Sequence, residues 1–160
     1  MGARKSRWLH LYTFNPLEMK KCLFLFLSLS WSFAYAQQWE VSFEKSQQKA
    51  LKENKKVLLV FSGSDWCIPC IRLEDKVWNS ATFKTYAEKY LLLYRADFPK
   101  RKKNQLPEEL NKINQVLASK YNPKGYFPWV VVFSPQGEVK GYFVYEEKTV
   151  EKYIEMIELL

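Results

Sequence analysis

The feature that most constrains this chain is the stretch of residues 57–70. It opens with a run of apolar, partly β-branched residues, 57–61, that is typical of a strand buried on both faces. The run ends at the turn-forming sequence Ser-Gly-Ser-Asp, and two cysteines, Cys67 and Cys70, follow with CxxC spacing. The apolar residues after them fit one face of a helix. The stretch therefore predicts a strand, a tight loop, and a helix whose first turn carries Cys67.

This placement would make Cys67 a reactive thiol. The first amides of a helix have no internal partner, and the helix dipole places partial positive charge there. Both effects would stabilise a thiolate at Cys67. Cys70, three residues on, lies on the same side of the helix and is near enough for a disulfide. Pro69 lacks an N–H and is tolerated in a first helical turn, where that N–H would be spare.

The N-terminal segment predicts export. A basic start at Met19, an apolar run over residues 22–33 and a small-x-small sequence ending at Ala36 are the parts of a secretory signal peptide. We expect a leader over residues 1–36, with Met19 as the functional start or residues 1–18 as an extension, and one domain over residues 37–160. The alternative is a retained signal anchor. Cleavage near Ala36 would deliver the protein to an exported, periplasmic location.

Cleavage would also change the inventory of reactive residues. Cys22 and the only histidine, His10, would be lost, leaving Cys67 and Cys70. No histidine base and no four-ligand zinc site can then be assembled in one chain, so neither a metal nor a cofactor is expected. Disulfides persist in exported compartments. A purely structural disulfide is the alternative to a redox-active one, but so small a loop would constrain the unfolded chain little.

The charge does not favour nucleic acid as a partner. The formal net charge is +8, but five basic residues and one acidic residue lie in the leader, which leaves a net charge of +4 on residues 37–160. The remaining basic cluster, residues 100–103, is more typical of a solvated loop. We therefore expect no nucleic-acid binding.

The rest of the chain alternates between strands and helices. Strands are expected at 39–41, 57–61, 90–97, 129–134 and 138–144, and helices at 42–54, 67–77, 81–89, 107–121 and 146–160. This order suits a mixed sheet with helices on both faces. The apolar residues expected in the core of three of these helices are Phe43, Ala50 and Leu51; Leu110, Ile113, Val116 and Leu117; and Val150, Tyr153, Ile154 and Ile157.

Two segments together resemble the thioredoxin superfamily. Asp-Trp-Cys-Ile-Pro-Cys at residues 65–70, after a buried strand, is similar to that family's active-site segment. Tyr-Phe-Pro-Trp-Val-Val-Val-Phe at residues 126–133 resembles its cis-proline segment leading into a central strand. CxxC alone is a weak signal, but the two motifs in this order are a strong one. The resemblance spans residues 39–160 and implies an α/β thioredoxin-like fold, a central mixed sheet flanked by helices on both faces.

The resemblance also implies roles for residues. Cys67 would be the attacking thiolate, exposed at the helix start, and Cys70 the buried, resolving thiol. Pro128 would be cis and lie against the disulfide, and the backbone of Phe127 would pair with the substrate chain; an ordinary trans proline is the alternative. Trp66 would form an apolar rim for the substrate, with Trp129, unless either packs in the core. Asp65 and Pro69 would support the site, Asp65 as a turn residue.

This chain departs from thioredoxin proper at two positions. The buried acidic residue that is a proposed proton carrier in that family aligns with Phe61, and the usual glycine between the cysteines is Ile68. Proton transfer to the second cysteine would therefore involve water or Glu74, one helical turn beyond Cys70. The Ile-Pro pair also supplies no histidine to stabilise the thiolate, which favours a reducing role.

The sequence thus predicts an exported enzyme that exchanges dithiols and disulfides with protein substrates, as a reductase or isomerase. Its partners would be protein thiols and disulfides and a membrane-spanning thiol electron donor, and it would act as a monomer. The alternative is a non-enzymatic binding module of the same fold, which would hold partners on the surface of residues 127–129 and keep a static disulfide. A peroxidase is less favoured, because no arginine can be placed beside the cysteines.

Overall fold

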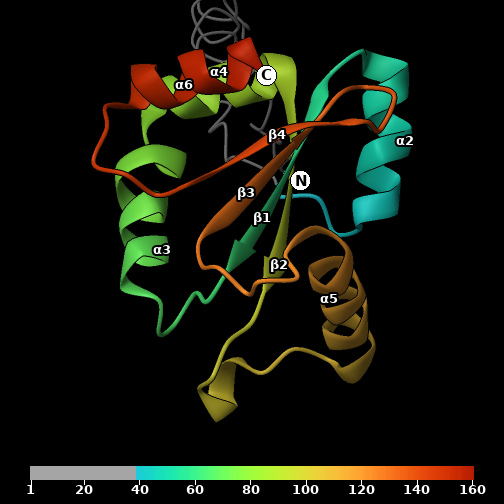
Figure 1. Ribbon diagram of the computed structural model, residues 1–160, viewed down its shortest axis with the longest axis vertical. Coiled ribbons are helices and arrows are strands. Elements are labelled where there is room, and N and C mark those ends of the chain that lie inside the picture. The colour runs from blue at the N-terminus through green and yellow to red at the C-terminus, as the bar shows by residue number, and fades with distance from the viewer. Residues whose placement is uncertain (1–38) are drawn as a thin grey trace, which may run out of the picture. The chain divides into compact units, whose positions relative to one another are not determined.

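The computed structural model describes residues 39–160, so the predicted leader, Met19 and the cleavage position lie outside the described residues. Figure 1 shows a central twisted sheet with helices on both faces. The strands are β1 (Lys56–Ser62), β2 (Leu91–Asp97), β3 (Trp129–Phe133) and β4 (Val139–Val144). Their order in the sheet is β2-β1-β3-β4; β1 and β2 are parallel, and the other two pairs are antiparallel. The predicted mixed sheet is confirmed.

Five α-helices and two short helical turns complete the described chain. The α-helices are α2 (Phe43–Glu53), α3 (Ile68–Leu73), α4 (Ala81–Tyr90), α5 (Glu108–Tyr121) and α6 (Val150–Leu159). The short turns are the π-helix η1 (Glu74–Trp78) and the 3₁₀ helix η2 (Lys102–Asn104). Among residues 39–160, no helix has the length and apolar character needed to cross a membrane.

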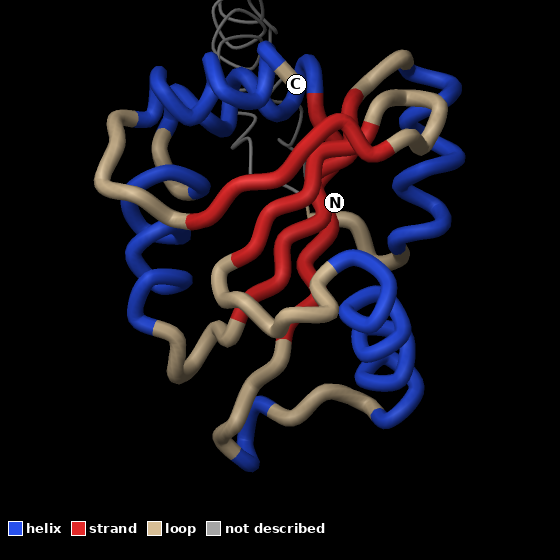
Figure 2. Tube along the Cα trace, in the orientation of Figure 1, coloured by secondary structure: helices blue, strands red, loops and turns tan. Residues whose placement is uncertain are grey.

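The side chains of β1 alternate between two hydrophobic cores, as the pleat of a strand requires. Leu58 and Val60 pack with α3, η1, α4 and α6, whereas Val57, Leu59 and Phe61 pack with α2 and α5. All five are at most 2% exposed. Figure 2 shows the helices on either side of the strands. The run of residues 57–61 is therefore buried on both faces, as its composition predicts.

Hydroxyl side chains fix where three helices begin. Ser42 accepts a hydrogen bond from the Lys45 amide at the start of α2, and Ser80 accepts one from the Phe83 amide at the start of α4. Both helices match their predicted ranges within one residue. The predicted start of the last helix at residue 146 is wrong, because Thr149 caps α6.

Two predictions of core packing are wrong. Leu51 is 63% exposed on α2, and on α5 Ile113 and Val116 are 45% and 68% exposed. The buried positions of α5 are instead Asn114 and Leu117, three residues apart on the face toward the sheet. The error arises because Asn114 is polar, so the apolar pattern does not include it. The pattern instead includes Ile113 and Val116, which lie on a neighbouring, exposed face of the helix.

Two predicted elements are shorter or less regular than expected. The strand at 39–41 is reduced to a single bridge between Trp39 and Leu93. The continuous helix at 67–77 is an α-helix that begins after Cys67 and changes to the π-helix η1. Its signature is the Asn79 amide, which donates to the Glu74 carbonyl five residues earlier.

Three connections meet at one edge of the sheet. β1 and β2 run parallel, and Ser62 at the end of β1 is paired with Asp97 at the end of β2. β3 runs the other way, so its first residue, Trp129, is paired with Phe61. The segments 63–67, 98–105 and 122–128 therefore lie together outside the sheet, where open α/β sheets bind their ligands.

Candidate redox site

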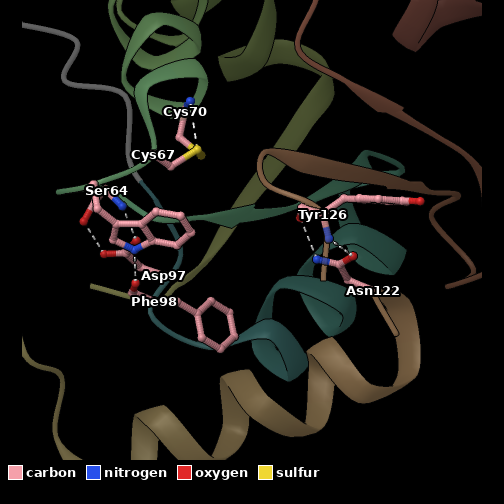
Figure 3. The surroundings of a disulfide bond; sticks show 8 residues. Ser64, Cys67, Cys70, Asp97, Phe98, Asn122 and Tyr126 are labelled. Atoms are coloured by element: carbon pink, nitrogen blue, oxygen red, sulfur yellow. Dashed lines mark hydrogen bonds between the residues drawn. A yellow bond between two sulfur atoms is a disulfide. The ribbon is translucent and has the colours of Figure 1, made fainter. Parts of the chain in front are cut away.

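The two cysteines form a disulfide at the start of α3. Cys67 is the N-cap residue, one position before the predicted first turn, and its Cα lies 5.2 Å from that of Cys70. The Cys70 amide donates to the Cys67 sulfur over 3.3 Å (Figure 3). An N–H directed at this sulfur would favour its charged form in the reduced protein. Pro69 is the second helical residue, where its missing N–H costs no intrahelical hydrogen bond.

Burial does not distinguish the two sulfurs in this disulfide. We expected an exposed first cysteine and a buried second one, but Cys67 and Cys70 are each 4% exposed. The neighbours are more open, since Ile68 between them is 62% exposed and Trp66 is 37% exposed. The distinction between the cysteines therefore depends on position: Cys67 is the one whose sulfur receives the helix-start amide.

Trp66 forms a wall beside the disulfide. Its Nε1 donates to the Phe98 carbonyl over 2.7 Å, and its ring lies edge-on to Phe127 with centroids 5.5 Å apart. Gly63 permits this position, because a Cβ there would lie 2.6 Å from the Trp66 Nε1. Trp66, predicted for the substrate rim, and Phe127, predicted to pair with the substrate backbone, are thus brought together. Trp129 is not beside them: its Nε1 bonds the Tyr121 carbonyl and its ring stacks elsewhere.

Asp65 holds the neighbouring loop. Its carboxylate accepts hydrogen bonds from the backbone amides of Lys100 and Arg101, at 2.9 and 3.0 Å, and from the side-chain amide of Asn104 at 2.9 Å. These donors hold the pKa of the Asp65 carboxyl below its usual range, the Lys100 amide most strongly. Three donors are the pattern of a structural anchor, which agrees with its expected role as a turn residue.

A second carboxylate ties the same loop to the turn before the cysteines. Asp97 accepts from the amide and the hydroxyl of Ser64, at 2.9 and 2.5 Å (Figure 3). The Phe98 amide donates to the Ser62 carbonyl over 2.8 Å. The turn before Cys67 and the loop after β2 therefore form one hydrogen-bonded unit.

The side chain of Asn122 positions the segment at residues 122–128. Asn122 is 4% exposed; its side chain donates to the Tyr126 carbonyl over 2.8 Å and accepts from the Tyr126 amide over 3.0 Å (Figure 3). This pair fixes the loop just before the Phe127–Pro128 peptide bond, which is cis. Pro128 itself is buried.

Glu74 lies one helical turn beyond Cys70, at the start of the π-helix. Its carboxylate forms an ion pair with Arg95, whose guanidinium carbon lies 4.1 Å from the centroid of the Trp39 ring. Burial raises the pKa of Glu74, and the nearby Arg95 charge opposes that shift. Phe61, the residue expected at the position of thioredoxin's acidic residue, is fully buried in the core that contains α2 and α5.

Several residues that shape this site have no role in the sequence analysis. They hold the segments around the disulfide in place through hydrogen bonds or close packing: Gly63, Ser64, Asp97, Phe98 and Asn122. A local signal exists for only two of them, because Gly63 and Ser64 stand in the turn before the CxxC pair. Asp97 at the end of a predicted strand could have been flagged from the rule that neighbouring parallel strands end at the same edge.

Within residues 39–160, no cluster of three or more histidine, cysteine, aspartate or glutamate side chains is placed to hold a metal ion. This edge of the sheet carries the Cys67–Cys70 disulfide, the Trp66–Phe127 aromatic pair and a turn with the cis Phe127–Pro128 bond. A CxxC disulfide at a helix start, on this mixed sheet with helices on both faces, defines a protein of the thioredoxin fold.

Comparison with known proteins agrees with this class. The thioredoxin-like family profile matches residues 38–135, so the chain belongs to the thioredoxin-like family. The disulfide bond reductase DsbH of Chlamydia pneumoniae is 37% identical over 101 residues, which are 63% of this chain and 58% of that protein. The thioredoxin-related protein DsbJ of the same organism is 25% identical over 83 residues, which are 52% of this chain and 23% of DsbJ. The matched regions thus span less than two thirds of either relative.

Solved structures show the same fold. The structure of a DsbH oxidoreductase superposes with a TM-score of 0.69 at 30% identity, over 76% of this chain and 82% of that one. A thioredoxin from Thermus thermophilus superposes with a TM-score of 0.58 at 13% identity, over 78% of this chain and 87% of that one. The predicted thioredoxin-like fold is confirmed.

Proposed function

We propose that this protein is an exported thiol–disulfide oxidoreductase that reduces disulfides in protein substrates through Cys67 and Cys70. The observation that carries the proposal is the bonded pair of sulfurs at the open edge of the sheet, with the Cys70 amide directed at the Cys67 sulfur. Homology to a disulfide bond reductase supports it.

The proposed reaction starts from the reduced pair. The Cys67 thiolate attacks one sulfur of a substrate disulfide, forms a mixed disulfide, and the other substrate sulfur leaves as a thiolate and takes a proton. Cys70, losing its proton, then attacks the Cys67 sulfur and releases the second substrate thiol. The substrate gains two electrons and two protons, and the protein is left with the Cys67–Cys70 disulfide that the structure contains.

The surface around the sulfurs suits an extended substrate chain. Trp66 and Phe127 form an aromatic wall, and we assign the Phe127 backbone, ahead of Pro128, to pairing with the substrate segment. Asp65 and Pro69 act through position: Asp65 anchors the adjoining loop, and Pro69 shapes the first turn of α3.

The reducing direction has two supports. The residues between the cysteines, Ile68 and Pro69, supply no cation that would stabilise the thiolate as strongly oxidising members of the superfamily require. The relative DsbH is named a disulfide bond reductase. A reductase outside the cytoplasm needs electrons from a membrane-spanning thiol donor, which would reduce the Cys67–Cys70 disulfide by the reverse exchange.

A redox titration against glutathione tests the direction. Known potentials of this chemistry run from about −270 mV for thioredoxin to about −120 mV for a strong oxidant, and 30 mV corresponds to about 1.4 kcal/mol. A reductase predicts a midpoint nearer the first value. A midpoint nearer the second would assign the protein to disulfide formation instead.

The activity itself is tested by mixing the dithiol-reduced protein with a disulfide-containing protein and counting new thiols. The double variant Cys67→Ser, Cys70→Ser should lose the activity completely, while Ser119→Ala on the exposed side of α5 should retain it. A double variant that keeps the protein's cellular phenotype would favour the alternative function, a binding module with a static disulfide.

Export is a separate part of the proposal. We propose that residues 1–36 direct secretion and are removed near Ala36, which would place the site in the periplasm. Sequencing the N-terminus of the protein recovered from the periplasmic fraction should find Gln37 or a near neighbour. Recovery of an intact leader in a membrane fraction would instead indicate a retained anchor.

A further inference from the structure

A pocket of about 440 Å³ is lined by Trp66, the residue before Cys67, and by Phe127, the residue before Pro128. Three aromatic rings shape it: Phe127 lies edge-on to both Trp66 and Phe98, each with centroids 5.5 Å apart. Leu106 adds a further apolar side chain. The volume is within the range of ordinary binding pockets and exceeds what one side chain fills.

The pocket carries positive charge at its rim. The Lys100 ammonium lies 4.0 Å from the centroid of the Trp66 ring, which holds it by a cation–π contact. None of the described residues that line the pocket is acidic; the other polar lining groups are the amides of Gln105 and Asn111. An anion at this rim would meet the Lys100 ammonium, and the carboxylate of Asp65, which lies outside the pocket lining, is already bonded by the loop.

The charge of the surrounding loop is available to a partner. Lys100, Arg101, Lys102 and Lys103 are all exposed, and within residues 39–160 none of them forms an ion pair with a carboxylate. The nearest carboxylate, Asp65, is occupied by two backbone amides of this loop and by Asn104. Asp65 thus fixes the loop by its backbone amides, and the basic side chains remain exposed.

The pocket is also fixed relative to the sulfurs. Trp66 precedes Cys67 directly and bonds the Phe98 carbonyl, and Phe127 precedes Pro128. An extended chain whose half-cystine reaches Cys67 would therefore pass the pocket within a few residues, since each extended residue spans about 3.3 Å.

We propose that this pocket selects substrates: it receives an aromatic side chain, next to an acidic one, from the protein segment that flanks the disulfide to be reduced. The aromatic ring enters between Trp66, Phe98 and Phe127, and the carboxylate pairs with Lys100 at the rim. This inference rests on the proposed reductase function and assigns it a substrate class.

Synthetic cystine peptides of one length test it. Each places Phe-Glu, Phe-Lys or Ser-Ser two residues before the half-cystine, and a second set places the same pairs two residues after it. The measurement is kcat/KM for disulfide reduction by the full-length reduced protein. In one of the two sets, kcat/KM for the Phe-Glu peptide should be about tenfold higher than for the Ser-Ser peptide, because burial of the aromatic ring contributes most to binding. It should be about fivefold higher than for the Phe-Lys peptide, because only the glutamate can pair with Lys100.

Two variants with the same change of charge separate the pocket from the general charge of the loop. Lys100→Glu should remove or reverse the preference for Phe-Glu over Phe-Lys. Lys103→Glu lies on the same loop but outside the pocket lining, and it should keep the preference within twofold. Lys100→Gln, which keeps the length of the side chain, should remove the preference without reversing it.

The outcomes distinguish the two levels of the proposal. Equal reduction of all three peptides in both sets, or equal effects of Lys100→Glu and Lys103→Glu, would overturn the substrate pocket and leave the reductase intact. No reduction of any peptide by a folded, fully reduced protein would overturn the proposed function itself.

Discussion

Two loops flank the disulfide, and they are held in place by different chemistry. The loop at residues 98–104 is exposed and basic, and the carboxylate of Asp65 holds its backbone. The loop at residues 122–127 is held by the neutral, buried amide of Asn122, which both donates to and accepts from the Tyr126 backbone. The first attachment depends on a charge that pH can remove, whereas the second depends on burial. The two loops should therefore lose their attachments under different conditions.

The largest effect is expected where the attachment is buried. Asn122→Ala leaves the Tyr126 amide and carbonyl without their partner, and each unpaired, partly buried group costs about 1–3 kcal/mol. We expect the free energy of unfolding to fall by about 2 kcal/mol in urea titrations. Asn111→Ala, an exposed position with no such bonds, should change it by less than about 0.5 kcal/mol. Equal losses in the two variants would show that Asn122 does not carry this attachment.

The charged attachment should loosen locally. Asp65→Asn removes the charge that the Lys100 and Arg101 amides bond, so hydrogen exchange at these two amides should accelerate about tenfold, while the Tyr126 amide is unaffected. Asp75→Asn, which neutralises an exposed carboxylate on η1, is the matched control. Unchanged exchange at Lys100 in Asp65→Asn would mean that the loop is held by its own packing.

The smallest effect is a dependence on pH. The folded protein lowers the pKa of Asp65 below the ordinary value of about 3.9, so the unfolded chain binds that proton more tightly. The contribution of Asp65 is thus fully present above about pH 3.9 and is lost as pH falls through the lower folded value. The amide chemical shifts of Lys100 and Arg101 should titrate with a midpoint below 3.9, and that of Tyr126 should not follow. A midpoint at or above 3.9 would contradict the assigned cause.

The sequence predicts the parts of this molecule that depend on local patterns. The buried strand β1, the serine caps of α2 and α4, and the order of elements follow from apolar periodicity and capping residues. The thioredoxin-like fold follows from two motifs in the right order. The predicted start of α6 at residue 146 overlooked a local signal, because Thr149 is a preferred N-cap residue and glutamate is not.

The reactive residues of the site could be predicted from the sequence, but the groups that position them could not. Cys67, Cys70, Trp66 and Phe127 lie in two recognisable motifs, and the fold brings them together. Several of the groups that position them bond across 30 or more residues of sequence, as Asp97 does to Ser64 and Phe98 does to Trp66. No periodicity records such pairs. The exposure of Cys67 was predicted wrongly, whereas Cys70 is buried as predicted.

The central claim is that Cys67 attacks and Cys70 resolves, and trapping tests it most directly. Cys70→Ser leaves the attacking sulfur without its resolving partner, so the mixed disulfide with substrate should accumulate; Cys67→Ser should trap little. Both single variants, expressed in the exported compartment, would be compared by non-reducing gels and mass spectrometry of the captured partners. The account predicts many partners bonded to Cys67 in Cys70→Ser and few in Cys67→Ser. Equal trapping by the two variants, or none by either, would contradict it.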